Sequence, residues 1–223
     1  MMRAFAALAG AALIASACST PALAESAVQT PAAAVTANEK GLKTAVFAGG
    51  CFWGIEGVFS HLKGVRSAVS GYHGGTAGDA KYDKVSGGRT THAEAVRVTY
   101  DPAVIRYDQL LQVFFAVGAD PTQLNRQGPD VGAQYRTAIV PMSAEQNRVA
   151  AAYLDQLRAA KLWKKPIVAR IERAQAFYPA ERYHQDFMAA NPKHPYIRMW
   201  DAPKVAALKR LFPGLYKPGF TTG

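Results

Sequence analysis

The chain has 223 residues, of which 49% are hydrophobic and 19% are charged, and its formal net charge is +10. This length and composition predict a globular protein with a sizeable core and exclude a disordered chain, a collagen-like repeat and a disulfide-stapled miniprotein. The two cysteines, Cys18 and Cys51, allow at most one disulfide and exclude a zinc site built from several thiolates. The basic residues form no long run, so we expect a solvated basic surface and no nucleic-acid interface.

The first 24 residues are typical of an export signal. Arg3 supplies a positive start, residues 4–17 are apolar and uncharged, and small residues precede a cleavage point after Ala24. The apolar run is shorter than the roughly 18 residues that a membrane-spanning helix needs, so no transmembrane helix is expected. We therefore expect a signal peptide over residues 1–24 and a periplasmic protein. Lipid attachment at Cys18 is the alternative, because the residues before it resemble a lipoprotein cleavage box.

Residues 25–40 are rich in Ala, Thr, Pro and Val with little periodicity, which predicts a flexible linker. A folded domain is expected over residues 41–200, followed by a C-terminal tail over 201–223 with one short helix. Apolar spacing predicts strands at 44–48, 65–72, 92–100, 135–140 and 167–174, and helices at 52–62, 107–117, 143–160, 180–190 and 205–211. Ser143, with Gln146 three residues later, predicts a capping box at the start of the helix over 143–160.

The predicted elements indicate the fold class. Strands and helices alternate without a consistent βαβ rhythm, and no internal repeat is visible. We therefore expect a single α+β domain, with helices packed on a central mixed sheet. A Gly-rich stretch over residues 71–89 is too polar for a core and long enough to be a functional loop, and residues 120–132 form another loop.

Cys51 stands where a predicted strand ends at Gly49-Gly50 and a predicted helix begins. Unpaired amide donors and the helix dipole both favour a thiolate at a helix N-terminus, so we expect a lowered pKa for Cys51. The alternative is that a lone cysteine is a small buried hydrophobe. Glycines on both sides let the backbone approach a ligand closely, and the turn could present Phe52 and Trp53 outward. Taken alone, these two aromatic residues could equally be core.

Here the sequence resembles a known family, the type A peptide methionine sulfoxide reductases. The signature is Gly50-Cys51-Phe52-Trp53-Gly54. The further matching motifs, in chain order, are Gly71-Tyr72-His73-Gly74-Gly75, Tyr82 within residues 81–85, His92-Ala93-Glu94-Ala95-Val96, residues 126–136 and residues 177–185. Together they extend over residues 43–192, nearly the whole predicted domain.

The resemblance implies a ferredoxin-like two-layer α/β sandwich and a peptide-methionine (S)-S-oxide reductase, with its catalytic domain over residues 41–200. It implies that Cys51 attacks the sulfur of a methionine sulfoxide, free or in a peptide or protein, with a preference for the S epimer. Phe52 and Trp53 match the aromatic walls that hold the substrate's S-methyl group. The polar positions that the resemblance implies around the sulfoxide oxygen and the thiol are Glu94, Tyr82, Tyr135 and, with the least defined role, Asp130.

The chemistry of a sulfoxide independently requires such polar groups. Its sulfur is a poor electrophile until the oxygen is protonated, and a neutral carboxylic acid in a partly apolar pocket can give that proton. Glu94 therefore needs a raised pKa. Taken alone it would be a solvated strand residue, but strand alternation places it on the more apolar face with Val96 and Val98. Tyr82 and Tyr135 alone would be amphipathic residues at a rim.

The product on Cys51 would be a sulfenic acid, the first step of the cysteine oxidation ladder. Many relatives then use a resolving cysteine in the C-terminal tail, but no cysteine follows Cys51 in this chain. It resembles the one-cysteine branch, in which an external thiol, a thioredoxin-like protein or a small dithiol, reduces the sulfenic acid. The other expectations are repair of oxidised proteins in the cell envelope, oxidised proteins, peptides or free methionine sulfoxide as substrates, no bound cofactor, no metal and a monomer.

Three alternatives to this chemistry stay open at the same Cys51. One is a thiol hydrolase, in which a pairing with His184 would need an oxyanion hole and an orienting Asn or Asp that nothing in the sequence marks. Another is a thiol peroxidase. The third is a protein that binds oxidised methionine without converting it.

Overall fold

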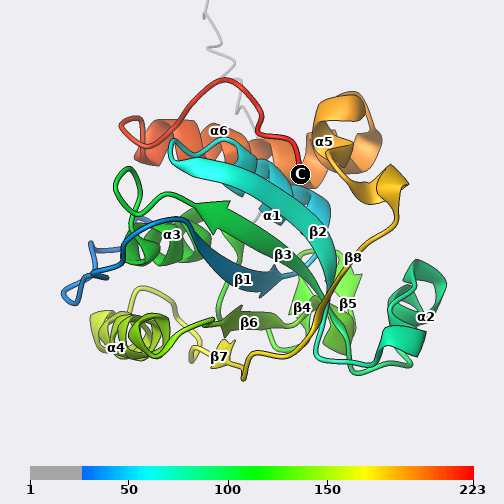
Figure 1. Ribbon diagram of the computed structural model, residues 1–223, viewed down its shortest axis with the longest axis horizontal. Helices are drawn as coiled ribbons and strands as arrows, with labels where there is room; N and C mark the ends of the chain where they lie inside the picture. Colours follow the sequence, from blue (N-terminus) through cyan, green and yellow to red (C-terminus); the bar gives the residue numbers. More distant parts are fainter. Residues whose placement is uncertain (1–26) are drawn as a thin grey trace, which may run out of the picture.

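A computed structural model describes residues 27–223 (Figure 1), so the predicted signal peptide and Cys18 lie outside the described residues. A six-stranded sheet, in the order β7-β6-β1-β3-β2-β8, forms the centre. Its strands are β1 (Lys43–Gly49), β2 (Val65–His73), β3 (Ala93–Tyr100), β6 (Thr137–Val140), β7 (Arg170–Ile171) and β8 (Phe177–Pro179). The β6–β7 pair is parallel and the other pairs are antiparallel, which confirms the predicted mixed sheet.

The longer helices cover one face of this sheet. They are α1 (Phe52–Ser60), α3 (Tyr107–Val113), α4 (Ala144–Ala160) and α6 (Ala202–Leu211). Their apolar residues share one large buried cluster with alternate strand residues such as Phe47 and Val96. The residues between these, such as Val46 and Ala95, lie in a smaller cluster on the opposite face. In Figure 1, α4 lies beside the β6–β7 edge and α6 beside β2. The expected α+β class is confirmed.

Two local sequence signals hold in detail. The Ser143 hydroxyl accepts a hydrogen bond from the Gln146 amide at 3.1 Å, as the predicted capping pattern requires. The predicted helix over 107–117 is present, but its second half, Phe114–Gly118, has π-helical spacing. Residues 27–223 contain no helix of the length and hydrophobicity that crossing a bilayer demands.

The segment predicted as a flexible linker is docked in its described part. Residues 27–42, which lead into β1, form no helix or strand. Hydrogen bonds nevertheless attach them to α3 and α4. The Ala37 amide donates to the Asp108 carboxylate at 3.0 Å, and the Tyr153 hydroxyl donates to the Pro31 carbonyl at 2.9 Å. The expectation of a flexible segment is corrected here, because side chains of the helices satisfy its backbone polar groups.

Two other stretches differ from their predictions. The strand expected over 167–174 is reduced to the two residues of β7. The helix expected over 180–190 is broken into a 3₁₀ turn, Arg182–His184, and α5 (Phe187–Ala190). It breaks because Asp186 has a φ of 54° and the Gln185 side chain donates to the backbone carbonyls of Ser70 and Ala180.

The two predicted loops contain short elements. The Gly-rich loop contains a 3₁₀ turn, Ala77–Asp79, and α2 (Tyr82–Ser86). The second loop contains a two-stranded hairpin of β4 (Arg126–Gln127) and β5 (Asp130–Val131), followed by a 3₁₀ turn, Ala133–Tyr135. A π-helical turn, Ile197–Asp201, directly precedes α6. These irregular segments carry most of the site.

Candidate active site

Cys51 is the N-cap residue of α1, directly after the end of β1, as the sequence predicts. The preceding residue, Gly50, has a φ of 85°, and a Cβ there would lie 2.4 Å from the Cβ of Gln127. Only glycine therefore fits at this turn, because a side chain would be strained and would push away the β4–β5 hairpin. Cys51 as a residue is partly exposed, and it lines a small cavity.

The predicted direction of the Cys51 pKa is wrong. The Trp53 amide donates a hydrogen bond that favours a thiolate, as expected at a helix start, but this effect is outweighed. Burial raises the pKa of Cys51 well above its usual range, and the negative charges of Glu94, Asp201 and Asp130 raise it further. The position of Cys51 at the helix start was predicted correctly. The carboxylates that raise its pKa, however, come from distant parts of the chain. The resting thiol is neutral.

Glu94 lies in β3 with 2% of its surface exposed. Burial raises its pKa to about 8, the charges of Asp130 and Asp201 act in the same direction, and a hydrogen bond from the Phe52 amide opposes them. That amide donates to Glu94 Oε2 at 3.0 Å, which fixes the carboxyl group beside the first turn of α1. At neutral pH this side chain is mainly a carboxylic acid, in agreement with the raised pKa that the chemistry requires.

Tyr82 and Tyr135 reach the same pocket from two short elements. Tyr82 begins α2, where its amide donates to Glu181 Oε1 at 2.9 Å, and Tyr135 ends the 3₁₀ turn after β5. Burial and the charge of Glu94 raise the pKa of Tyr82 to about 12 and move that of Tyr135 upward as well. Cys51 contributes to both shifts. Both phenols therefore stay protonated and can donate hydrogen bonds near the thiol.

Asp130, in β5, lines a small cavity together with Cys51. Burial raises its pKa, although the hydroxyl of Tyr196 donates a hydrogen bond to it and Lys204 lies near enough to oppose the rise. A small cavity adjoins the sulfur and is lined by Cys51, Gln127, Gly128, Pro129, Asp130, Tyr196, Trp200 and Lys204. The structure thus brings Cys51, Glu94, Tyr82, Tyr135 and Asp130 together, as the resemblance of the sequence motifs to the family implied.

The two predicted aromatic walls differ in exposure. Phe52 is not presented outward: 1% of it is exposed, and its ring lies 5.0 Å from that of His184. Trp53 is partly exposed, stacks on Phe187 at 3.8 Å, and donates its indole N–H to His184 Nδ1 at 3.2 Å. Phe52 thus also belongs to the core, because the C-terminal segments fold over the start of α1.

Several residues of the pocket were not found from the sequence. Tyr196, Trp200, Asp201 and Lys204 all come from residues 196–204, where no motif marks them. Gly54 reveals one of these contacts, since a Cβ there would lie 2.2 Å from Asp201 Oδ1. This glycine of the signature is needed for the tail to approach α1. No group of three or more Cys, His, Asp and Glu residues in positions 27–223 is arranged to hold a metal ion.

A thiol at a helix start, beside a neutral carboxylic acid and two phenols, defines a thiol-dependent enzyme with its own proton donor. The family profile "Peptide methionine sulfoxide reductase" matches residues 43–213. The chain is 58% identical over 176 residues to peptide methionine sulfoxide reductase MsrA 2 of Mesorhizobium japonicum, covering 79% of this chain and 90% of that protein. The protein of the same name from Synechocystis is 48% identical, with 80% and 83% covered.

Solved structures agree with these sequence matches. The reduced form of Mxr1 from Saccharomyces cerevisiae is 30% identical and has a TM-score of 0.62, covering 76% of this chain and 92% of that one. Methionine sulfoxide reductase A of Corynebacterium diphtheriae is 34% identical with a TM-score of 0.57, covering 70% and 77%. The chain belongs to the peptide methionine sulfoxide reductase family and acts as a reductase of methionine sulfoxide.

Proposed function

We propose that the chain reduces methionine-(S)-sulfoxide, free or in proteins, through a sulfenic acid on Cys51 that an external thiol then reduces. One observation carries this proposal. The carboxyl group of Glu94 is buried, has a pKa of about 8, and is bonded to the amide that directly follows Cys51. It supplies a proton donor for the sulfoxide oxygen at the point where the sulfur nucleophile stands.

In the first half of the reaction the sulfur of Cys51 forms a bond to the sulfoxide sulfur, while Glu94 gives its proton to the sulfoxide oxygen. The bond between the two sulfur atoms then breaks as the oxygen passes from the methionine sulfur to Cys51, which ends as S–OH, and the thiol proton returns to Glu94. A thiol and a sulfoxide thus become a sulfenic acid and a thioether. The hydroxyl groups of Tyr82 and Tyr135 hold the polarised oxygen during this transfer.

The raised pKa of Cys51 fits this sequence of proton transfers. Because the negative charge of Glu94 is one cause of that rise, a thiolate and an ionised Glu94 disfavour each other. Both groups therefore keep their protons at neutral pH. When the sulfoxide binds, Glu94 gives its proton to the oxygen, and the carboxylate that remains accepts the thiol proton, so the nucleophile is activated when the substrate is present.

The second half of the reaction needs two electrons from outside the chain. No cysteine follows Cys51, so a thiolate of the reductant attacks the sulfenic acid, releases water and forms a mixed disulfide. A second thiol of the reductant then frees Cys51 and leaves the reductant as a disulfide. A thioredoxin-like protein or a small dithiol has the required pair of thiols. The absence of a cysteine after Cys51 in this sequence supports membership of the one-cysteine branch of the family.

Intact-mass spectrometry tests the first half directly. Mature protein receives one equivalent of methionine-(S)-sulfoxide without reductant, and the expected result is a gain of one oxygen and release of one methionine per thiol. The matched controls are the R epimer and Cys51→Ser, which should release none. Turnover of an ester or a peroxide without any methionine released would favour the thiol hydrolase or the thiol peroxidase. Binding without release would favour a binding protein.

Repair of oxidised proteins in the cell envelope is the setting that the predicted export signal supports. The same intact-mass spectrum gives the mature N-terminus, which should begin at Glu25. A mass that includes a lipid on Cys18 would support the lipoprotein route, and an uncleaved N-terminus in the cytoplasmic fraction would contradict export.

A further inference from the structure

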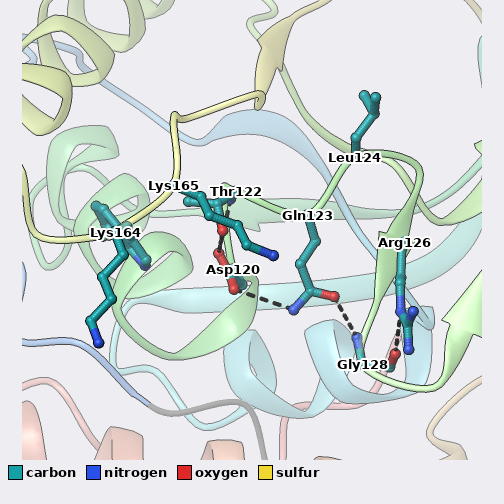
Figure 2. Close-up of a pocket in the computed structure, with 9 residues that line it drawn as sticks. Asp120, Thr122, Gln123, Leu124, Arg126, Gly128, Lys164 and Lys165 are labelled. Atoms are coloured by element: carbon teal, nitrogen blue, oxygen red, sulfur yellow. Dashed lines mark hydrogen bonds between the residues drawn. The ribbon is translucent and has the colours of Figure 1, made fainter.

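Two adjoining cavities lie away from the thiol, and together they form what we call the basic groove. The first, of about 710 Å³, lies between residues 120–128 and residues 163–165 (Figure 2). The second, of about 540 Å³, shares Trp163, Lys164 and Lys165 with the first and continues to residues 157–167. Both are open to solvent, and both are far larger than the small cavity beside Cys51.

The basic groove carries cations that the described residues leave unpaired. Lys161, Lys164 and Lys165 are exposed, and within residues 27–223 no carboxylate forms an ion pair with any of them. Arg126 lies at the other end of the first cavity from Lys164 in Figure 2, and its Nε donates to the carbonyl of Gly128 at 2.9 Å. Arg158 is the one cation of the groove that is paired, with Asp155 at 2.8 Å.

The carboxylate that lines the first cavity is engaged by its own loop. Asp120 Oδ1 accepts hydrogen bonds from the amide of Thr122 at 2.8 Å and from its hydroxyl at 2.7 Å. Asp120 Oδ2 accepts one from the Gln123 side chain at 3.2 Å, and Figure 2 shows this chain of bonds continuing to Gly128. Asp120 therefore shapes the loop, while the surrounding cations give the groove a positive potential that attracts anionic groups.

The groove and the thiol pocket lie against the same loop. Gly128 lines both the first cavity and the small cavity beside Cys51. The neighbouring residue, Gln127, is buried against Gly50, and its side chain exchanges hydrogen bonds of 3.0 and 2.8 Å with the backbone of Asp120. One loop thus forms the wall of both sites. An extended polypeptide advances about 3.3 Å per residue, so a chain that places a side chain at Cys51 can continue into the groove.

The shape and the spread of charge decide the kind of occupant. The cations are distributed along the groove and do not converge on one point, which suits a chain of several carboxylates better than a single small anion. Two exposed apolar side chains, Leu124 and Leu162, lie among them and provide contacts for a polypeptide. The overall charge of +10 adds long-range attraction for acidic partners.

We propose that the basic groove binds an acidic stretch of the oxidised polypeptide whose methionine sulfoxide occupies the thiol pocket. The chain then prefers sulfoxides that have several Asp or Glu residues nearby in the sequence. This inference rests on the proposed function, because it assigns the groove to the substrate of that reaction.

The test compares four peptides and free methionine sulfoxide, with dithiothreitol as the reductant in each case. Each peptide has one methionine sulfoxide and four acidic or neutral residues, all Glu or all Gln, at positions three to eight away. In one Glu peptide and its matching Gln peptide these residues lie on the amino side, and in the other pair they lie on the carboxyl side. The groove variant is K164E/K165E. The matched control is K40E/R210E, which reverses the same amount of charge on exposed residues outside the groove.

The control positions are remote from the groove. The residue two before Lys40, Asn38, bonds through its amide to Glu145 in the first turn of α4, whereas the groove begins at the last turn of that helix. A helix of 17 residues is about 25 Å long, which separates Lys40 from the groove. Arg210 lies in α6, at the other end of the sheet (Figure 1).

The wild-type chain should reduce one of the Glu peptides with a kcat/KM about five- to tenfold above that of the Gln peptide at low salt, mainly through KM. K164E/K165E should lose this preference, K40E/R210E should keep it, and free methionine sulfoxide should be reduced equally by all three proteins. An equal loss in both variants, or no preference in the wild type, would overturn the proposal.

Two further outcomes are distinguishable. If K164E/K165E slows turnover only when a thioredoxin-like protein replaces dithiothreitol, the groove serves the reductant and the substrate proposal is wrong. If the wild-type chain fails to reduce free methionine sulfoxide, the proposed function has failed before the groove is tested.

Discussion

The thiol pocket and the basic groove share one loop, but their ionisable side chains lie in opposite environments, buried in the pocket and exposed in the groove. In the pocket, burial moves the pKa of Glu94 to about 8, and Cys51 and the tyrosines stay protonated. In the groove, Lys161, Lys164 and Lys165 are open to solvent. Desolvation makes the electrostatic interactions of each group in the pocket strong, whereas screening by water and salt means that each cation of the groove contributes little binding energy by itself.

The largest expected effect is in the pocket. Cys51→Ser should abolish turnover of free or dabsylated methionine sulfoxide, because a hydroxyl group is a far weaker nucleophile and no other cysteine follows it in the chain. Thermal unfolding checks that the fold is intact, and full activity in this variant would falsify the mechanism.

Glu94→Gln should lower kcat/KM by about 10²–10³-fold with the fold unchanged, because an amide keeps the shape and the hydrogen bond but cannot give up a proton. Glu56→Gln is the matched control. Glu56 is also fully buried in the same region, and burial raises its pKa to about 8, but it faces Ser70 and Asp186 and not the thiol. Steady-state kinetics should show near wild-type activity for Glu56→Gln. Equal losses of kcat/KM in the two variants would contradict the role of Glu94 as the proton donor.

The pH profile follows from the same carboxyl group. Since Glu94 must be protonated and its pKa is about 8, kcat/KM for free methionine sulfoxide should be constant below that pH and fall about tenfold per unit above it. Glu94→Gln should lack this alkaline decline. A wild-type rate that keeps rising above pH 9 would show that thiol ionisation, and not the carboxylic acid, limits the reaction.

Tyr82→Phe and Tyr135→Phe should each lower kcat/KM by about tenfold, the effect of one lost hydrogen bond to a charged oxygen. Kinetics with free methionine sulfoxide measure both, with Tyr183→Phe as the exposed control. A decrease confined to KM would instead assign the two phenols to ordinary substrate binding.

Salt should separate the two regions, with the smallest effect of all. Raising the salt from about 0.05 to about 0.5 M should lower kcat/KM for the preferred acidic peptide several-fold, because the groove cations are screened. The same change should alter the rate with free methionine sulfoxide less than twofold, because its reaction occurs in the buried pocket. Equal salt dependence with both substrates would contradict the claim that the groove cations attract the acidic peptide.

The prediction from sequence succeeded where the signal is local. Gly49-Gly50 ends a strand, apolar spacing begins a helix, and Cys51 falls between them, so its place at the helix start needs no distant contact. The Ser143 cap was predicted for the same reason. The helix expected over 180–190 is broken because hydrogen bonds between the Gln185 side chain and the distant backbone of Ser70 override the local helical preference.

By itself, the sequence determined the fold class, the position of the nucleophile and the absence of a later cysteine to resolve it. Only the tertiary structure decided the proton state of Cys51, because the charges that raise its pKa come from Glu94 in β3, Asp130 in β5 and Asp201 in the tail. It also decided the basic groove, which forms where residues 120–128 meet residues 163–165. Electrostatic energy depends on distance in space, and local sequence patterns do not contain that distance.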